Sequence, residues 1–422
     1  MNLKSLKEVT SFISRGITPK YNKDGIVVIN QRCIRNNSLS LTEARKTDSE
    51  QRKIPTEKYL KENDVLINST GVGTLGRSAQ IKNLSCDITV DSHVSIVRPD
   101  PDLLNPLFLG YAIQFKEPDI ENLAEGSTGQ TELSRVRLGE EIFIPIFSKK
   151  IQKKVVQILN NINEKIEVNS KINKNLENIS QEIFKSWFIK FDPFLNEKFK
   201  KENNLKFPKS FHTGIFSDLI EETISGDWGK SEIEGNYIKE VYCVRGADIP
   251  DVKKGNKGKM PIRYILLKNY NKKKLKNNDI ILEISGGSPT QSTGRAVAIT
   301  QSFINRFDKP MICTNFCKVI RPIEHYNLFL YYYWNYFYDI EVMFSYENGT
   351  TGIKNFDVNG FINNEMIIIP PLPVVKKFNK IIMSFSKQIF NNALESEKLI
   401  KMRDSLLPKL MSGEIDVSNV KI

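Results

Sequence analysis

The segment Asp64-Val65-Leu66-Ile67 recurs as Asp279-Ile280-Ile281-Leu282, at an offset of 215 residues. Other pairs of segments match in the same order, and their offset grows from 210 to 225 along the chain. Collinear matches with a slowly growing offset are typical of a duplicated module that has gained short loop insertions. The chain therefore contains two copies of one module. The further pairs are Cys33-Ile34-Arg35 with Cys243-Val244-Arg245, Gly76-Arg77-Ser78-Ala79 with Gly294-Arg295-Ala296-Val297, Val97-Arg98-Pro99 with Ile320-Arg321-Pro322, Gly126-Ser127-Thr128-Gly129 with Gly349-Thr350-Thr351-Gly352, and Ile144-Pro145 with Ile369-Pro370.

Each copy has a β-rich α+β composition. Short runs rich in Val, Ile and Thr are separated by Gly, Asn, Pro and Ser, a pattern that predicts short strands. Each copy also contains one segment rich in aliphatic and aromatic residues that is long enough for a core helix. The expected strands include residues 64–68, 87–97, 279–284 and 296–300, and the expected helices are residues 105–115 and 327–339.

A long amphipathic helix is expected after each copy, because apolar residues there recur every three or four positions. A helix of 35 to 40 residues spans roughly 50 to 60 Å and needs a partner along its length. The economical partner is the other helix. Asn169 and Asn392 interrupt the apolar positions of the two helices. Either they are buried amides that fix the register of one helix against the other, or they are exposed residues without such a role. The residues expected to pair are Ile158, Ile162, Asn169, Leu176, Ile183, Ile382, Ile389, Asn392, Leu399 and Leu406.

This pattern divides the chain into six parts. The predicted division is a first module at 1–148, a central helix at 149–192, a connector at 193–225, a second module at 226–372, a C-terminal helix at 373–412 and a tail at 413–422.

Composition narrows the class of protein. The 422 residues are enough for several cores, and the formal charge of +12 favours a polyanionic partner, although a solvated lysine-rich surface explains it equally well. Five scattered cysteines without a signal peptide indicate reduced thiols in a cytoplasmic setting. No apolar run is long enough for a membrane span. Cys313, Cys317 and His325 are too loosely spaced to predict a metal site.

The segment Gly71-Val72-Gly73-Thr74-Leu75-Gly76 satisfies the GxGxxG pattern of dinucleotide sites. Such a site needs a helix that begins at the last glycine and points its amino terminus at the pyrophosphate. The residues that follow instead have the composition of a strand. Nucleotide binding is therefore not expected here.

Both copies place a loop rich in Gly, Ser and Thr between a strand and a Gly-Arg pair. Glycine allows close approach of the backbone, hydroxyls suit phosphate oxygens, and arginine forks onto phosphate or guanine. The repetition favours a DNA-reading hairpin over an ordinary glycine-rich hairpin. The candidate DNA-binding residues are Arg15, Arg32, Arg35, Ser69, Thr70, Thr74, Arg77 and Thr128 in the first copy, and Arg245, Lys253, Lys254, Ser285, Ser288, Gln291, Thr293, Arg295 and Thr351 in the second.

Catalytic motifs are missing from the sequence. It contains no HExxH, GxSxG or P-loop pattern, and no tetrapeptide of the kind used to flip a target base. We therefore expect a non-catalytic protein.

Several segments together resemble the specificity (S) subunit of type I restriction-modification systems, over nearly the whole chain. They are Arg15-Gly16-Ile17-Thr18-Pro19-Lys20-Tyr21, Val28-Ile29-Asn30-Gln31-Arg32-Cys33-Ile34-Arg35, Gly73-Thr74-Leu75-Gly76-Arg77, Gly226-Asp227-Trp228-Gly229, Arg245-Gly246-Ala247-Asp248-Ile249-Pro250, Glu283-Ile284-Ser285-Gly286-Gly287-Ser288 and Ser405-Leu406-Leu407-Pro408-Lys409-Leu410.

The resemblance implies two target recognition domains, each reading half of a split DNA site, separated by an antiparallel pair of long helices. It also implies two methyltransferase (modification) subunits that use S-adenosylmethionine, and restriction subunits that use ATP and Mg. This chain itself is then expected to hold no cofactor. The alternative is a coiled-coil scaffold whose β-rich domains bind protein or carbohydrate.

Overall fold

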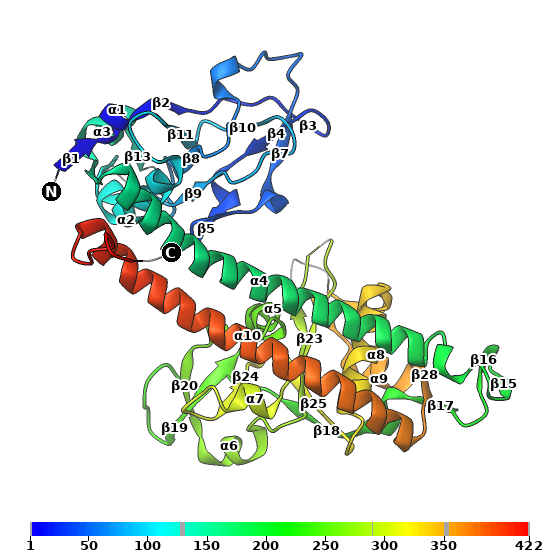
Figure 1. Cartoon of the computed structure of the whole chain (residues 1–422). Coiled ribbons are helices and arrows are strands. Elements are labelled where there is room, and N and C mark those ends of the chain that lie inside the picture. The colour runs from blue at the N-terminus through cyan, green and yellow to red at the C-terminus, as the bar shows by residue number, and fades with distance from the viewer. Residues whose placement is uncertain (1, 127–130, 289, 350–353, 421–422) are drawn as a thin grey trace. The chain divides into compact units, whose positions relative to one another are not determined.

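The computed structural model describes residues 2–126, 131–288, 290–349 and 354–420 (Figure 1). Two compact units share the chain: residues 1–164 with 399–422 form the first, and residues 165–398 form the second. Two long helices, α4 (Lys149–Phe188) and α10 (Leu372–Ser412), each contribute one end to each unit.

The first unit is built on two four-stranded sheets. One has the order β2-β11-β8-β9 and is antiparallel, and the other has the order β10-β4-β7-β3 with β10 parallel to β4. The bounds are β2 (Thr10–Arg15), β11 (Val94–Pro99), β8 (Val65–Asn68), β9 (Ser78–Gln80), β10 (Ile88–Val90), β4 (Ile26–Ile29), β7 (Arg45–Thr47) and β3 (Tyr21–Asn22), with the pairs β1 (Asn2–Ser5) and β14 (Phe143–Ile146), β12 (Ala124–Glu125) and β13 (Glu132–Leu133), β5 (Ile34–Arg35) and β6 (Ser38–Leu39), and helices α1 (Leu6–Val9), α2 (Pro106–Asn122) and α3 (Arg135–Glu141).

The second unit repeats this topology. Its antiparallel sheet has the order β18-β25-β21-β23, and its other sheet has the order β20-β19-β24 with β19 parallel to β24. The bounds are β18 (Ile220–Ser225), β25 (Cys317–Pro322), β21 (Ile280–Glu283), β23 (Ala296–Ala298), β20 (Ile262–Leu266), β19 (Tyr237–Val244), β24 (Met311–Cys313), the pair β17 (His212–Ile215) and β28 (Met366–Ile369), the sheet β22 (Ser285–Gly286), β27 (Lys354–Phe356) and β26 (Glu347–Asn348), the hairpin β15 (Phe199–Glu202) and β16 (Leu205–Pro208), and helices α5 (Ile249–Lys253), α6 (Leu267–Lys273), α7 (Gln301–Ile304), α8 (Asn327–Asp339) and α9 (Val358–Asn364).

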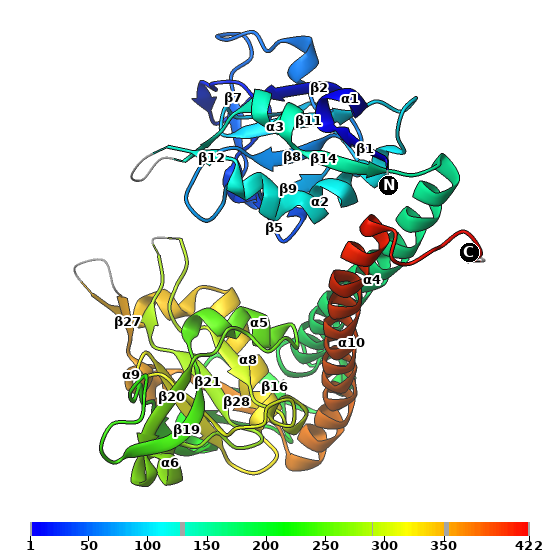
Figure 2. The same ribbon diagram turned by 90° about the vertical axis from the view of Figure 1, so that its left-hand side faces the viewer.

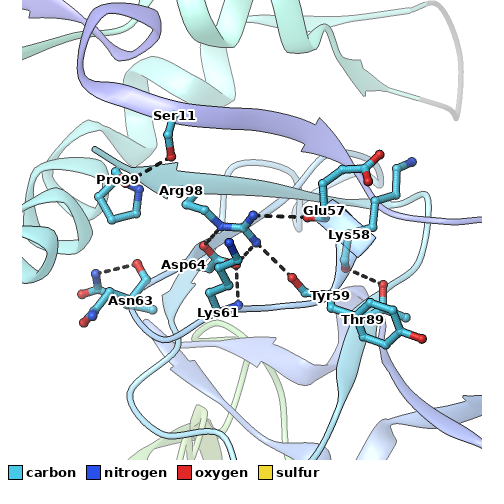
Figure 3. Close-up of polar contacts among 11 residues, drawn as sticks. Ser11, Glu57, Lys58, Tyr59, Lys61, Asn63, Asp64, Thr89, Arg98 and Pro99 are labelled. Carbon is cyan, nitrogen blue, oxygen red and sulfur yellow. Dashed lines mark hydrogen bonds and ion pairs between the residues drawn. The ribbon is translucent and has the colours of Figure 1, made fainter. Parts of the chain in front are cut away.

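The duplication extends to individual ion pairs. Asp64 is fully buried and accepts two hydrogen bonds of 2.8 Å from the Nε and Nη2 atoms of Arg98, as Figure 3 shows. The equivalent Asp279 accepts the same two bonds from Arg321, at 2.9 and 3.1 Å. Each pair joins two neighbouring strands of the antiparallel sheet. The sequence repeat therefore reflects two copies of one fold, as predicted.

The second module begins earlier than the sequence indicated. Strands β17 and β18 lie within the predicted connector 193–225, yet β17 pairs with β28 and β18 pairs with β25. They are the counterparts of β1 and β2, which pair with β14 and β11. These strands carry none of the matched segments, because the two copies share their pairing but not their sequence there. Only the part before His212, which includes the hairpin of β15 and β16, lacks a counterpart.

The helices α4 and α10 run antiparallel and lie side by side in both views (Figures 1 and 2). Helix α4 ends at Phe188, four residues before the predicted limit, and Phe191 adopts a left-handed φ of 60° before Pro193. From the sequence we expected each long helix to pack only against the other, but each helix also packs into a domain core. In the second unit the rings of Phe188 and Phe329 lie 5.0 Å apart, and those of Phe188 and Phe378 lie 5.1 Å apart.

The predicted pairing residues of the helices divide by burial. Ile162, Asn169, Ile382, Ile389 and Asn392 are buried, and Ile158, Leu176, Ile183, Leu399 and Leu406 are partly buried. Among the described helices, none is long and apolar enough to cross a membrane.

Candidate DNA interface

In each module the glycine-rich loop lies beside residues that flank a second segment that the sequence singled out separately, although most of that segment lies outside the described residues. In the first module the N–H of Leu133 on β13 donates to the carbonyl oxygen of Ser69 at 2.9 Å. In the second, β22 pairs with β27, and Phe356 N–H donates to Ile284 at 2.9 Å. The described residues that flank the second segment are thus hydrogen-bonded to the residues at the start of the glycine-rich loop, whereas Thr128 and Thr351 lie outside the described residues.

The glycine-rich loops end with the same backbone geometry. Gly76 and Gly294 have left-handed φ values of 86° and 92°, and their N–H groups donate to Asn68 and Glu283, each at 2.9 Å. A residue with a side chain rarely adopts this conformation. Each loop then continues into a short strand, β9 or β23, and no helix begins there. The structure therefore lacks the helix that a dinucleotide site requires at this position.

The two arginines that end these loops differ in environment. Arg77 is exposed, and its Nη2 donates to the carbonyl oxygen of Gly73 at 2.6 Å. Arg295 instead forms two hydrogen bonds of 2.6 Å with the carboxylate of Glu283, and these bonds raise the pKa of its guanidinium. The first module has Asn68 in place of that glutamate. The charge of Arg77 is thus open to a ligand, whereas that of Arg295 is largely neutralised inside the fold.

Two of the predicted hydroxyl contacts are buried. Ser69 Oγ lies 2.6 Å from Ser95 Oγ, and Thr293 Oγ1 donates to Glu347 at 2.9 Å. Both side chains are shielded from solvent, so the structure argues against their contact with DNA. The other predicted loop residues are partly or fully exposed at the loop surfaces: Thr70, Thr74, Ser285, Ser288 and Gln291.

Comparison with known proteins identifies the family of the two modules. A family model described as the type I restriction modification DNA specificity domain matches residues 1–178 and again residues 227–402. The chain belongs to this family. The resemblance found in the sequence is therefore confirmed, and the two matched segments correspond to the two modules.

Individual relatives agree with this assignment. The type I restriction enzyme MjaIX specificity subunit of Methanocaldococcus jannaschii is 28% identical over 296 residues, which cover 67% of this chain and 62% of the relative. The HindI specificity subunit of Haemophilus influenzae is 22% identical over 454 residues, covering 96% of this chain and 98% of the relative. The crystal structure of an S subunit from M. genitalium covers 99% of this chain and 96% of its own, with a TM-score of 0.54 and 15% identity, and shows the same fold.

The basic candidates of the first specificity domain lie at its surface. Arg32 and Arg35 are exposed. Arg15 is half-buried, and it donates to the carbonyl oxygen of Leu133 at 2.8 Å beside an ion pair of 3.4 Å with Glu132. Arg15 thereby lies beside β13, where it lines an open groove of about 440 Å³.

The basic candidates of the second specificity domain are more constrained. Arg245 forms a bidentate pair with the buried Asp248, at 2.9 and 3.1 Å. Lys253 donates to Asn335 at 2.8 Å, and burial lowers the pKa of its amine while raising that of the nearby Glu177 carboxyl. A lysine in this position does not reach DNA without leaving its partners, which argues against the prediction for Lys253. Lys254 remains exposed.

An arginine stacked on an aromatic ring occurs in both domains, and the sequence analysis did not predict it. The guanidinium of Arg45 on β7 lies 3.3 Å from the ring centre of Tyr21, and that of Arg263 on β20 lies 4.3 Å from the ring centre of Trp228. Strands β7 and β20 occupy equivalent places beside β4 and β19. Tyr21 and Trp228 are 39% and 40% exposed, so both stacks face solvent. The residues are too far apart along the chain for spacing to reveal them.

Proposed function

We propose that each specificity domain reads one half of a bipartite DNA sequence through its glycine-rich loop and the residues hydrogen-bonded to it. The observation that carries the proposal is the recurrence of one loop architecture in two modules of a DNA specificity family. Loops held by strand hydrogen bonds present side chains in a fixed position, while their sequences differ between the modules. Two such surfaces suit two different half-sites.

The helix pair supports a role in spacing. A continuous helix of 40 residues has a rise of roughly 60 Å, and α4 and α10 each extend from one unit into the other. Buried amides between the helices fix their register, because sliding one helix past the other would leave those amides unpaired. On this proposal the helices set the number of base pairs between the two half-sites.

On this proposal the catalytic activities of the restriction-modification complex belong to other chains. We expect this chain to be a non-catalytic cytoplasmic subunit that binds double-stranded DNA and docks two methyltransferase subunits and restriction subunits. S-adenosylmethionine, ATP and Mg would then belong to those partners. Support comes from the family, whose relatives are named specificity subunits, and from the absence of catalytic motifs in the sequence.

Salt-dependent DNA binding tests the proposal. The full chain, with its modification subunits, is titrated with duplex DNA that contains the methylated sequence of its host and with a scrambled duplex of equal length. Specific reading predicts a steep fall of affinity with salt for both duplexes and a preference for the first that persists at every salt concentration. A flat salt response without preference would contradict DNA recognition and would favour a scaffold that binds protein or carbohydrate.

A further inference from the structure

One position carries a different ring in each module on the same backbone. His93 lies in the turn between β10 and β11, and Phe316 lies in the turn between β24 and β25. The carbonyl oxygen of His93 accepts from Ser69 N–H at 2.8 Å, and that of Phe316 accepts from Ile284 N–H at 2.9 Å. Both rings are therefore anchored where the glycine-rich loop begins.

The turn around each ring is held in the same way. The N–H of Asp91 donates to Ile29, and that of the equivalent Thr314 donates to Val244, each at 2.9 Å. The turn then closes through hydrogen bonds from Val94 to Asp91 at 3.1 Å and from Cys317 to Thr314 at 2.9 Å. The backbone of the turn is thus common to both modules. Because its hydrogen bonds involve backbone atoms alone, the turn can carry either a histidine or a phenylalanine ring at this position.

The fold does not require these side chains. His93 is exposed, and Phe316 is 55% exposed although it is among the largest apolar side chains. A single exposed apolar residue is common on protein surfaces and indicates nothing by itself. Here the position adjoins the glycine-rich loop in both modules, and the two rings differ in chemistry, which suits two modules that read two different half-sites.

We propose that His93 and Phe316 are specificity-determining residues for the first and second half-sites. Phe316 makes an apolar contact with the C5-methyl group of a thymine in the major groove. Nδ1 of His93 lies 2.9 Å from Thr70 Oγ1, which leaves Nε2 as the ring nitrogen that meets a hydrogen-bonding base edge. The inference rests on the proposed function and names the residues through which the same surface reads DNA.

Replacing thymine by uracil removes only the methyl group and tests the contact of Phe316. Binding of the chain, in complex with its modification subunits, is measured on duplexes in which each thymine of the second half-site is changed to uracil in turn. One such change is expected to weaken wild-type binding about three- to fivefold, the value of one buried methyl group. Phe316→Ala should lose at least the same factor on the thymine duplex and should not respond to uracil at that position.

Ile238→Ala is the matched control, because Ile238 is 60% exposed near the start of β19, at the end of that strand remote from Val244 and the glycine-rich loop. This variant should keep the wild-type response to uracil. The contact is refuted if Phe316→Ala still responds to uracil as the wild type does, even when its overall affinity is lower, since the ring then acts as a wedge or a structural group. If the wild type prefers no bipartite sequence, the proposed function fails together with this inference.

Exchange of the histidine provides the second test. His93→Phe should change the base preference in the first half-site and leave the second half-site unaltered, as read from the methylated sequences of cells that carry the variant. An unchanged first half-site would refute the role of His93. Full methylation at the second half-site in the same cells shows that the variant is folded and assembled.

Discussion

Asn392 donates its side-chain amide to Oδ1 of Asn173 across the helix pair, at 2.9 Å. The reciprocal contact joins the side-chain amide of Asn169 to Ser396 Oγ at 3.2 Å. Asn392 lies 223 positions after Asn169, and Ser396 lies 223 positions after Asn173, so the two contacts are equivalent in the repeat. Asn169 and Asn392 are both buried, so the structure favours the buried interpretation of these residues over the exposed one. The sequence repeat of the modules thus extends through the helices as well.

Removal of one member of this amide network should destabilise the helix pair. Asn392→Ala leaves Oδ1 of Asn173 buried without its donor, and we expect it to lower the free energy of unfolding by about 1 to 3 kcal/mol. Urea denaturation measures the change. Ala at the exposed neighbour Leu394 on the same helix is the control and should have a smaller effect. Equal stability of the Asn392 variant and the wild type would contradict a register role for the amides.

Loss of Arg98 or of its counterpart Arg321 should lower the stability of the fold. Arg98→Met or Arg321→Met leaves the carboxylate of Asp64 or Asp279 buried without its cation, and we expect a loss of about 3 to 5 kcal/mol in unfolding free energy. Chemical denaturation of each variant measures this. The exposed Arg35→Met is the control. Losses similar to that control would show that the ion pairs do not support the sheets.

The two loop arginines should respond differently to substitution by alanine. Arg77→Ala is expected to leave stability nearly unchanged and to weaken DNA binding while reducing its dependence on salt. Arg295→Ala is expected to lower stability, because it leaves Glu283 buried without its partner. Parallel salt titrations and unfolding curves separate the two effects. Lys61→Ala, exposed at the opposite end of β8, is the control for Arg77, and identical behaviour of these two variants would refute a DNA contact of Arg77.

Asp248 should make stability depend on pH in the acid range. Burial raises its pKa, but hydrogen bonds from Arg245 and from the N–H of Lys259 outweigh burial, so the pKa lies below its ordinary value. A depressed folded-state pKa stabilises the fold above the unfolded value and loses that contribution as the pH falls through the folded value. Stability should therefore fall below about pH 4, and Asp248→Asn should show a weaker fall. Unfolding curves from pH 3 to 7 test this, and identical pH profiles would contradict it.

Insertion of one heptad into both helices tests the spacing role. Seven added residues in α4 near residue 165 and seven in α10 near residue 398 extend each helix by about 10 Å. The proposal predicts a spacer about three base pairs longer, as read from the methylated sequence, because successive base pairs are about 3.4 Å apart. Insertion into α4 alone is the control, since it shifts the α4 end of the first unit relative to its α10 neighbour, breaks contacts such as that of Arg403 with Asn163, and should abolish reading. An unchanged spacer in the double insertion would refute the spacing role.

The sequence predicted those features that depend on regular patterns. The Asp64 and Asp279 segments matched because burial of their ion pairs leaves little freedom for substitution, and the helix period was clear because one face of each helix is apolar. The strands β17 and β18 were missed because their partners β28 and β25 are distant in sequence. Strand pairing is a long-range property that local composition does not record.

Side-chain environments at the loops were predicted least well. Ser69, Thr293 and Lys253 have the residue types of DNA contacts, but the fold buries all three against partners elsewhere in the chain. His93 and Phe316 were overlooked for the opposite reason. Their equivalence rests on backbone hydrogen bonds, and a histidine aligned with a phenylalanine gives no signal in a search for repeated residues.

The central claim is that this chain selects a bipartite DNA site through two independent modules. Mapping of methylated adenines in host DNA, with and without a working copy of this chain, tests it most directly. We expect methylation within one sequence composed of two specific halves and a spacer of fixed length, and we expect it to be lost when the chain is removed. Methylation that persists without the chain, or that follows a single uninterrupted sequence, would show that this chain does not select a bipartite site.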